Sequence, residues 1–410
     1  MDYIKKTSPK IAALLAAEKR RQNETIDLIA SENIISPAVR LAQASFFSNK
    51  YAEGYAGKRY YPGNEFADQL ENYVQKLAVR TFNLSPNVWK VNVQPYSGSP
   101  ANLEVYNALL GFGDTIMGLG LSNGGHLTHG HKVNFSGKAY RVVHYGVNDK
   151  TGRIDYEEMA RLAKANKPKL IISGATAYSR AIDFQKIGRL AKLIGAWHMA
   201  DISHIAGLVA AKIHPSPFPW ADIVTTTTHK TLRGPRAAMI FSKKHLSDRI
   251  DRSVFPGMQG GPHLNIIAAL GLALEEANTS LFRKYQNEVV KNAKVLAKAL
   301  SDYSFNIVSG GTDNHLMLID LKSKNINGLD AEKLLERAGI IANRNTVPGD
   351  ATPFNPSGLR IGTPSATTRG MGTNEMKQIA KWIHELIDDK RSSKAVLLEV
   401  RKLTRRYPLK

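Results

Sequence analysis

Cysteine is absent from all 410 residues of the chain. A chain without thiols forms no disulfide and no thiolate metal site, and the reducing cytoplasm is the compartment that this composition fits. Long apolar runs are also missing, since no stretch approaches the ~20 residues that cross a bilayer. Residues 1–22 hold too short an apolar stretch for a secretory signal and instead predict an amphipathic helix with Ile11, Leu14 and Leu15 on one side.

Acidic residues are scarce, with 35 Asp and Glu against 56 Lys and Arg, so the formal net charge is +21. Such an excess attracts anions, including nucleic acids and membrane surfaces. The basic residues are dispersed along the chain and are densest near its two ends, at 19–21 and 402–406. A nucleic-acid footprint usually forms a stripe or patch, so we favour a solvated basic surface and keep nucleic-acid binding as the alternative.

Strand-like and helix-like patterns alternate through the middle of the chain. Strands are expected at 114–119, 168–174, 196–203 and 221–229, and helices at 64–82 and 183–195. This alternation predicts an α/β fold with a mostly parallel sheet covered by helices. Ligands bind such sheets at the carboxyl ends of the strands.

A second, smaller α/β unit is predicted at the C-terminal end. A helical stretch over 263–302 precedes a strand at 315–321 and helices at 330–338 and 373–390. The expected domains are an N-terminal arm (1–50), a large domain (51–275) and a small domain (276–410).

Lys230 lies in the segment VTTTTHKTLRGPR (224–236), directly after an apolar strand. A lysine that is partly desolvated there has a lowered pKa and a nucleophilic amine. Such amines form Schiff bases with carbonyl cofactors. A solvated lysine after a strand is the ordinary alternative.

Asp201 lies near the end of the preceding strand, in HMADISHIAGL (198–208). A buried carboxylate there can keep the ring nitrogen of a pyridoxal cofactor protonated. The alternative is a helix N-cap. His204, three residues later, is either a hydrogen-bonding partner of the cofactor or a packed side chain.

Ser97, Gly98 and Ser99 come just before a helical pattern, where free N–H groups, hydroxyls and the helix dipole favour an anion such as phosphate. A glycine-rich turn at 255–262 can add further backbone donors. An ordinary serine cap and a simple loop are the alternatives.

Three histidines, at positions 126, 129 and 131, raise the question of a metal. We argue against one, because no carboxylate is near in sequence and no helical register holds the ligands. A flat imidazole stacked on a cofactor ring is the preferred interpretation for His126. In GLRIGTP (358–364), Arg360 lies within a short apolar strand, where it requires a partner, either a ligand carboxylate or a structural ion pair.

Together these segments resemble the serine hydroxymethyltransferase family. The resemblance runs from LIASEN (28–33) through KYAEGYAGKRYYPG (50–63), SGSPAN, GGHLTHG (124–130) and TTTTHKTLRGPR to GLRIGTPSATTRGM. It implies the aminotransferase-like fold (fold type I) of pyridoxal-phosphate enzymes. It also implies the reversible transfer of the serine hydroxymethyl group to tetrahydrofolate or a related pterin, giving glycine.

The resemblance also implies roles for individual residues. Lys230 matches the lysine that bonds the cofactor, Asp201 the partner of the pyridine nitrogen, and His126 the stacked ring. Other cofactor contacts match Ser97, Gly98, Ser99, Thr176, His204, Thr227, His229, Gly261 and, from a partner subunit, Tyr51. The substrate-binding positions match Ser31, Glu53, Tyr61 and Arg360, and the folate-binding positions match Tyr60, Tyr61, Leu121, Leu127 and Asn345.

Glu53 matches the acid/base carboxylate, also supplied by the partner, and Tyr61 is expected among the catalytic residues. Two subunits that build one site imply an obligate homodimer, or a tetramer made of two dimers. An aldolase or an α-methylserine hydroxymethyltransferase is the neighbouring alternative. A nucleic-acid-binding protein on an inactive copy of the fold is the alternative from another class. Gly120 and His131 depart from the family pattern near the expected folate entrance, so the choice of pterin stays open.

Overall fold

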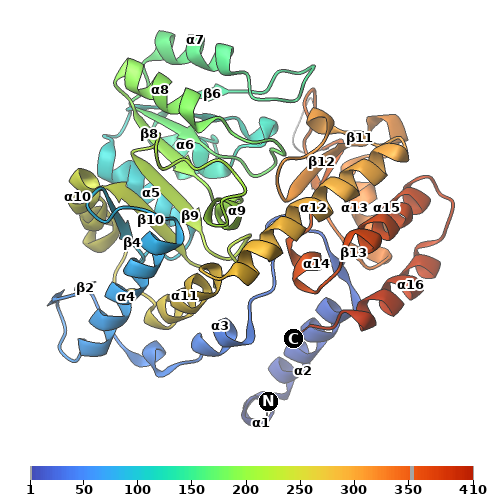
Figure 1. Ribbon diagram of the computed structural model, residues 1–410, viewed down its shortest axis with the longest axis horizontal. Helices are drawn as coiled ribbons and strands as arrows, with labels where there is room; N and C mark the ends of the chain where they lie inside the picture. The colour runs from blue at the N-terminus through green and yellow to red at the C-terminus, as the bar shows by residue number, and fades with distance from the viewer. Residues whose placement is uncertain (1, 351–354, 410) are drawn as a thin grey trace.

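The computed structural model describes residues 2–350 and 355–409 and has two lobes connected by a long helix (Figure 1). The larger lobe is built on a seven-stranded sheet. Across the sheet the strands are β4 (Trp89–Asn92), β10 (Ala238–Lys243), β9 (Ile223–Thr227), β8 (Trp197–Asp201), β7 (Leu170–Ser173), β5 (Thr115–Leu119) and β6 (Arg141–Tyr145). The predicted α/β class is confirmed.

Neighbouring strands from β9 to β6 pair in parallel, whereas β10 is antiparallel to both β9 and β4. All four predicted strands of this lobe are present, and β4, β6 and β10 were not anticipated. The connection from β9 to β10 covers only residues 228–237 and contains no crossover helix. A parallel return needs a crossover of a dozen or more residues, so β10 runs back alongside β9. This tight connection carries Lys230.

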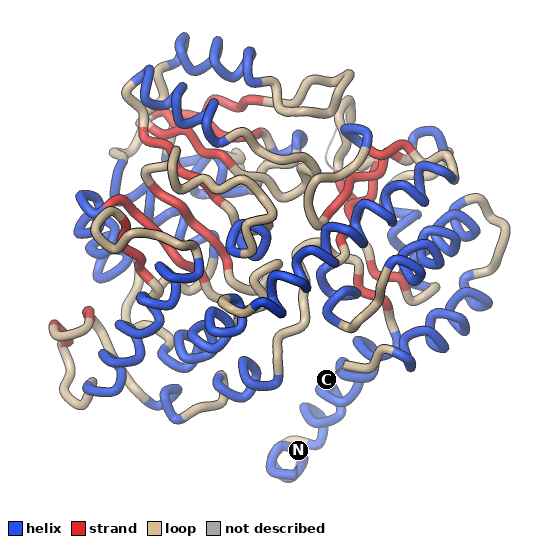
Figure 2. The backbone as a smooth tube through the Cα atoms, in the orientation of Figure 1, coloured by secondary structure: helices blue, strands red, loops and turns tan. Residues whose placement is uncertain are grey.

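Helices cover both faces of the large sheet (Figures 1 and 2). Alternate residues of each strand point to opposite faces, as the two-residue period requires. In β10, Met239 and Phe241 pack in one core cluster, and Ala238 and Ile240 pack in another. The covering helices are α4 (Glu65–Thr81), α7 (Tyr156–Asn166), α8 (Phe184–Ile194) and α11 (Leu264–Ala277) on one face, and α5 (Gly98–Leu109) and α10 (Ser247–Arg252) on the other.

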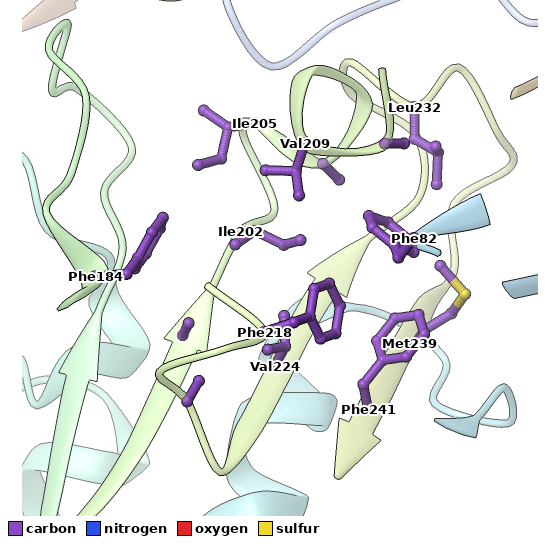
Figure 3. Close-up of a cluster of buried hydrophobic side chains, with 14 of the residues drawn as sticks. Phe82, Phe184, Ile202, Ile205, Val209, Phe218, Val224, Leu232, Met239 and Phe241 are labelled. Carbon is purple, nitrogen blue, oxygen red and sulfur yellow. The ribbon is translucent and has the colours of Figure 1, made fainter. Parts of the chain in front are cut away.

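Figure 3 shows part of the first cluster, where the rings of Phe82, Phe218 and Phe241 meet. The Phe241 ring centroid lies 5.2 Å from that of Phe82 and 5.3 Å from that of Phe218. Both pairs are edge-on, the arrangement that aromatic quadrupoles favour. This face of the sheet is therefore packed against a cluster of aromatic rings.

The smaller lobe is an antiparallel four-stranded sheet covered by helices. Its strands, in spatial order, are β11 (Asn306–Ile307), β12 (Leu316–Asp320), β15 (Gly358–Gly362) and β14 (Asn343–Asn345). The predicted strand at 315–321 and helices at 330–338 and 373–390 are confirmed as β12, α13 (Gly328–Arg337) and α15 (Thr373–Ile387). Further helices and strands are α3 (Pro37–Ala42), α6 (Phe135–Ala139), α9 (Ala206–Ala210), α14 (Pro364–Thr368), α16 (Ser393–Arg406), β2 (Gly54–Tyr55) and β3 (Lys58–Arg59).

The prediction of one continuous helical stretch over 263–302 is wrong. The stretch consists of α11 and α12 (Ser280–Asp302), separated at residues 278 and 279. Asn278 donates its side-chain amide to the Leu274 carbonyl and so closes α11, while the Thr279 hydroxyl accepts from the Phe282 N–H and begins α12. Side chains of this kind compete with a continuous backbone ladder.

The N-terminal helix is also divided, into α1 (Asp2–Thr7) and α2 (Pro9–Glu24). Ser8 caps α2 through the Ile11 N–H, and Pro9 occupies its first turn, the position that proline favours. Ile11, Leu14 and Leu15 lie on α2 as expected but are exposed. The described part of the chain therefore leaves this apolar face uncovered.

The two lobes share α12. Its residues Phe282 and Val290 pack in the core of the large lobe, and Ala293, Leu296 and Leu300 pack in that of the small lobe. Ile26 and Leu28, from the predicted N-terminal arm, also pack in the small-lobe core, where β1 (Ile26–Asp27) pairs with β13 (Ile340–Ile341). The domain borders given above stay predictions. Within the described residues, no helix has the length and apolarity that crossing a membrane requires.

Candidate active site

A cavity of about 430 Å³ opens at the carboxyl ends of β7, β8 and β9, where the two lobes meet. The strand-end rule predicted this location. Most of the residues predicted for the site line the cavity: Ser31, Ser97, Gly98, Ser99, Leu121, His126, Leu127, Thr176, Asp201, His204, Thr227, His229, Lys230 and Arg360.

Lys230 is buried at the wall of the cavity, three residues beyond the end of β9. Burial lowers the pKa of its amine to about 8, and the charges of Arg360 and Arg236 act in the same direction against the attraction of Asp201. No carboxylate lies within ion-pairing distance of this amine in the part of the chain that the structure describes. Lys230 thus has the desolvated, nucleophilic amine that its position after a strand predicted.

Asp201 ends β8 and faces the same cavity. Its Oδ2 lies 3.2 Å from His129 Nε2 and accepts from Asn102 Nδ2 at 2.9 Å, and its Oδ1 accepts from the Ser203 N–H at 3.0 Å. Burial raises the pKa of this carboxyl, but the hydrogen bonds from His129 and Asn102 outweigh burial and bring the pKa well below its usual value. Asp201 is therefore a largely buried carboxylate that stays ionised at neutral pH.

His126 begins the 3₁₀ turn η3 (Leu127–His129), and its Nδ1 accepts from the Thr128 N–H at 3.2 Å. Burial, together with neighbouring His129, lowers the pKa of His126 to about 4. The ring is neutral at physiological pH and lines the cavity, as a stacking role requires. Within the described residues, no group of three or more His, Asp or Glu side chains is placed to hold a metal ion.

The N-terminus of α5 lines the cavity and is a candidate anion cradle. Ser97 is the N-cap residue, yet its hydroxyl makes no capping bond to its own helix. A Cβ on Gly98 would lie 2.6 Å from the Thr227 methyl carbon, so a larger residue there would have to displace the Thr227 side chain. His229 also lines the cavity, and its buried Nδ1 has no hydrogen-bond partner among the described residues. Free hydroxyls, helix N–H groups and an unpaired imidazole nitrogen suit a phosphate.

Arg360 projects from the middle of β15 into the cavity. Its Nε donates to Asn343 Oδ1 at 3.1 Å, and one terminal nitrogen donates to the Thr176 carbonyl at 2.9 Å. Burial lowers the pKa of its guanidinium to about 10. No ion pair to Arg360 forms within the described ranges, so the alternative of a structural ion pair receives no support. The free side of the guanidinium matches a carboxylate from a ligand.

Six predicted residues do not line this cavity: Tyr51, Glu53, Tyr60, Tyr61, Gly261 and Asn345. Four of them are neighbours elsewhere on the chain: the Tyr51 and Tyr61 rings are 5.2 Å apart, and both Tyr51 and Glu53 border Gly261. Tyr60 packs edge-on against Phe255. Asn345 ends β14, beside Thr346, which contacts the Ser122 carbonyl next to Leu121. The sequence-based prediction assigned Tyr51 and Glu53 to a partner subunit's site, and that assignment stays a prediction.

Several residues at or beside the cavity were not predicted, notably His129, Asn102, Ser203 and Arg236. His129 and Asn102 lie 72 and 99 residues from Asp201, so sequence proximity gave no sign of the contacts. His129 lies in the motif GGHLTHG, and Asn102 lies in the motif SGSPAN. A buried carboxylate that stays ionised needs hydrogen-bond donors, so the donor side chains of these two motifs were the signal that could have found both residues.

Comparison with known proteins agrees with this geometry. The family model described as serine hydroxymethyltransferase matches residues 4–383. A serine hydroxymethyltransferase from Koribacter versatilis (strain Ellin345) is 53% identical over 383 residues, which cover 93% of this chain and 89% of the relative. The resemblance found from the motifs is confirmed: the chain belongs to the serine hydroxymethyltransferase family, and it is a transferase enzyme.

Proposed function

We propose that the cavity holds pyridoxal phosphate and that the chain uses it to transfer the serine hydroxymethyl group to tetrahydrofolate or a related pterin. The observation that carries the proposal is a desolvated lysine and an aspartate with a lowered pKa, facing one cavity beside the candidate anion cradle. When bound, pyridoxal phosphate supplies an aldehyde that bonds amines and a ring that withdraws electrons.

The residues of the chain fit this cofactor. Lys230 supplies an amine whose lowered pKa of about 8 leaves a substantial neutral fraction near that pH. Asp201, held ionised by His129 and Asn102, can keep a proton on a ring nitrogen. The neutral His126 offers a flat face for stacking. The α5 N-terminus, with Ser97, Gly98, Ser99 and His229, can hold the phosphate.

Substrate binding is assigned to Arg360 and Ser31, which line the same cavity. A guanidinium fork fixes the orientation of a bound carboxylate. The serine Cα is thereby held in one orientation relative to Lys230 and Asp201. We assign the acid/base role to Glu53 of a second copy, with Tyr51, Tyr61 and Gly261 from the same surface. The folate positions are assigned to Tyr60, Leu121, Leu127 and Asn345.

A homodimer is part of this proposal. Tyr51, Tyr60 and Tyr61 are exposed in the single chain, as are Ile11, Leu14 and Leu15 of α2. Large apolar side chains gathered on a surface mark interaction sites, and a second copy would both cover them and complete the cavity. A cytoplasmic location, which the absence of cysteine fits, is also proposed.

The proposal is tested by borohydride reduction of the protein as purified, followed by peptide mapping. We expect a yellow protein that loses its visible band on reduction, with the modification on Lys230 alone. Serine cleavage should then be stimulated by tetrahydrofolate. A colourless protein, or a label on another lysine, would refute the cofactor assignment. Strong cleavage that is indifferent to tetrahydrofolate would favour an aldolase.

The lowered pKa of Lys230 predicts the pH dependence of cofactor capture. Only the neutral amine attacks an aldehyde. With a pKa of about 8, the capture rate of cofactor-free protein should rise about tenfold per pH unit below pH 8 and level off above it. Stopped-flow absorbance after mixing with pyridoxal phosphate measures this. A capture rate that keeps rising up to pH 10.5, which is the ordinary pKa of lysine, would show that Lys230 is not desolvated.

A further inference from the structure

Asn33 joins three separate parts of the molecule through its side-chain amide. It lies two residues after Ser31, in the segment that leads from β1 to α3. Its Nδ2 donates to the Lys230 carbonyl at 2.9 Å and to the Tyr285 hydroxyl at 2.9 Å. Its Oδ1 accepts from the Thr368 hydroxyl at 2.7 Å and from the Ile34 N–H at 2.9 Å.

The orientation of this amide is fixed by its partners. A backbone carbonyl only accepts, so the nitrogen of Asn33, and not its oxygen, must face Lys230. The Ile34 N–H only donates, so the oxygen must lie on the other side. Both amide hydrogens and both oxygen lone pairs are used, which makes this a fully satisfied, part-buried network.

The partners of Asn33 belong to elements that carry the proposed cofactor and substrate residues. Lys230 is on the segment that connects β9 to β10 (residues 228–237), here called the lysine connection. Tyr285 is on α12. Thr368 is on α14, which begins two residues after β15, the strand that carries Arg360. The chain just before Asn33 is tied to β15 as well, because the Gly362 N–H donates to the Leu28 carbonyl at 2.7 Å. Asn33 therefore links the lysine connection to the small lobe.

The lysine connection needs such support. Arg233, three residues after Lys230, has a φ of 60°, a left-handed conformation that costs free energy in a non-glycine residue. Its guanidinium lies over the Tyr285 ring, 5.0 Å from the centroid. The same tyrosine thus contacts Arg233 through its ring and Asn33 through its hydroxyl.

We propose that Asn33 is a positioning residue for the reaction: by holding the Lys230 carbonyl against Tyr285 and Thr368, it sets the placement of the Lys230 amine relative to Arg360 and Ser31. This inference rests on the proposed role of Lys230. Asn33 acts through the backbone of the lysine connection and not by contact with a ligand.

The test compares Asn33→Ala, Asn33→Asp and Tyr285→Phe with the control Asn265→Ala in the full-length protein loaded with pyridoxal phosphate. Asn265 is a matched residue, because its Nδ2 also donates to a backbone carbonyl, that of Gln43, at 2.8 Å and outside the cavity. Two quantities are measured: kcat and KM for serine, and deuterium uptake of the peptide covering 228–234.

We expect Asn33→Ala and Asn33→Asp to lower kcat about tenfold with less than about a threefold change in KM, and to increase deuterium uptake in 228–234. Asp is informative because it keeps the acceptor oxygens and loses both donors. Tyr285→Phe retains the bond to Lys230 and should lower kcat only about threefold. Asn265→Ala should change neither quantity.

The inference is overturned if the Asn33 variants match Asn265→Ala, or if kcat falls while uptake in 228–234 stays at the wild-type level. Should Asn33→Ala fail to fold, Asn33→Asp and Tyr285→Phe decide the matter by the same two measurements. Failure of the proposed function has a different signature. It would appear in the wild-type protein as a borohydride label away from Lys230, while the uptake comparison would still show whether Asn33 fixes the connection.

Discussion

Replacing Lys230 by alanine should lower glycine release from serine by about a thousandfold or more, because the variant loses the only group assigned to bond the cofactor aldehyde. The proposal assigns the reaction to this buried amine, whose pKa is lowered to about 8. The measurement is steady-state turnover at saturating serine and tetrahydrofolate, over enough time for many cycles. Lys230→Arg should be equally inactive, since it restores the charge and not the nucleophile.

A matched control for Lys230 is Lys324→Ala. Lys324 is another largely buried lysine, but it pairs with Asp388 in the small lobe, away from the cavity. We expect this variant to turn over serine at close to the wild-type rate, with a modest loss of stability. If Lys230→Ala protein released glycine at the normal rate through repeated turnovers, the assignment of the cavity would be wrong.

Replacing Asp201 by asparagine should lower kcat about a hundredfold, the second largest effect that we expect. The amide is nearly isosteric but carries no charge to keep a proton on the cofactor ring. It also cannot satisfy its neighbours. Oδ2 faces donors on His129 and Asn102, and Oδ1 faces the Ser203 N–H. Whichever way the amide turns, its NH2 group meets another donor.

The control for this change is Asp222→Asn, at the opposite end of the same strands. The Asp222 carboxylate accepts the His198 N–H at 2.9 Å, at the start of β8. Its replacement should leave kcat within about twofold of wild type, because the cavity lies at the other strand ends. Thermal unfolding of both variants separates catalytic loss from misfolding. Equal kcat values for Asp201→Asn and wild type would contradict the role given to Asp201.

The sheet and the heart of the site could be predicted because both follow from short-range patterns. Asp201 and Lys230 each come at the end of an apolar strand, and parallel strands bring such positions to one edge. The candidate anion cradle was predicted from a local pattern too: Ser97 is the N-cap residue of α5, and Gly98 and Ser99 lie in its first turn. These local signals needed no knowledge of distant contacts.

What the sequence did not yield depends on contacts between distant residues or on competition between local signals. The bond between His129 and Asp201 joins residues 72 positions apart. The break between α11 and α12 is set by side-chain bonds of Asn278 and Thr279, whereas the apolar spacing continues across it. Residues such as Tyr51 and Glu53 were assigned by resemblance alone, because a loop carboxylate between tyrosines is physically ordinary in a single chain.

The sharing of α12 between the two hydrophobic cores has a consequence for how the protein can be divided. A fragment ending before this helix would lose Phe282 and Val290 from the large-lobe core, and a fragment starting after it would lose Ala293, Leu296 and Leu300 from the other. Neither half would retain a complete interior. The two lobes are therefore expected to melt as one cooperative unit, and recombinant halves to be insoluble when each is expressed alone.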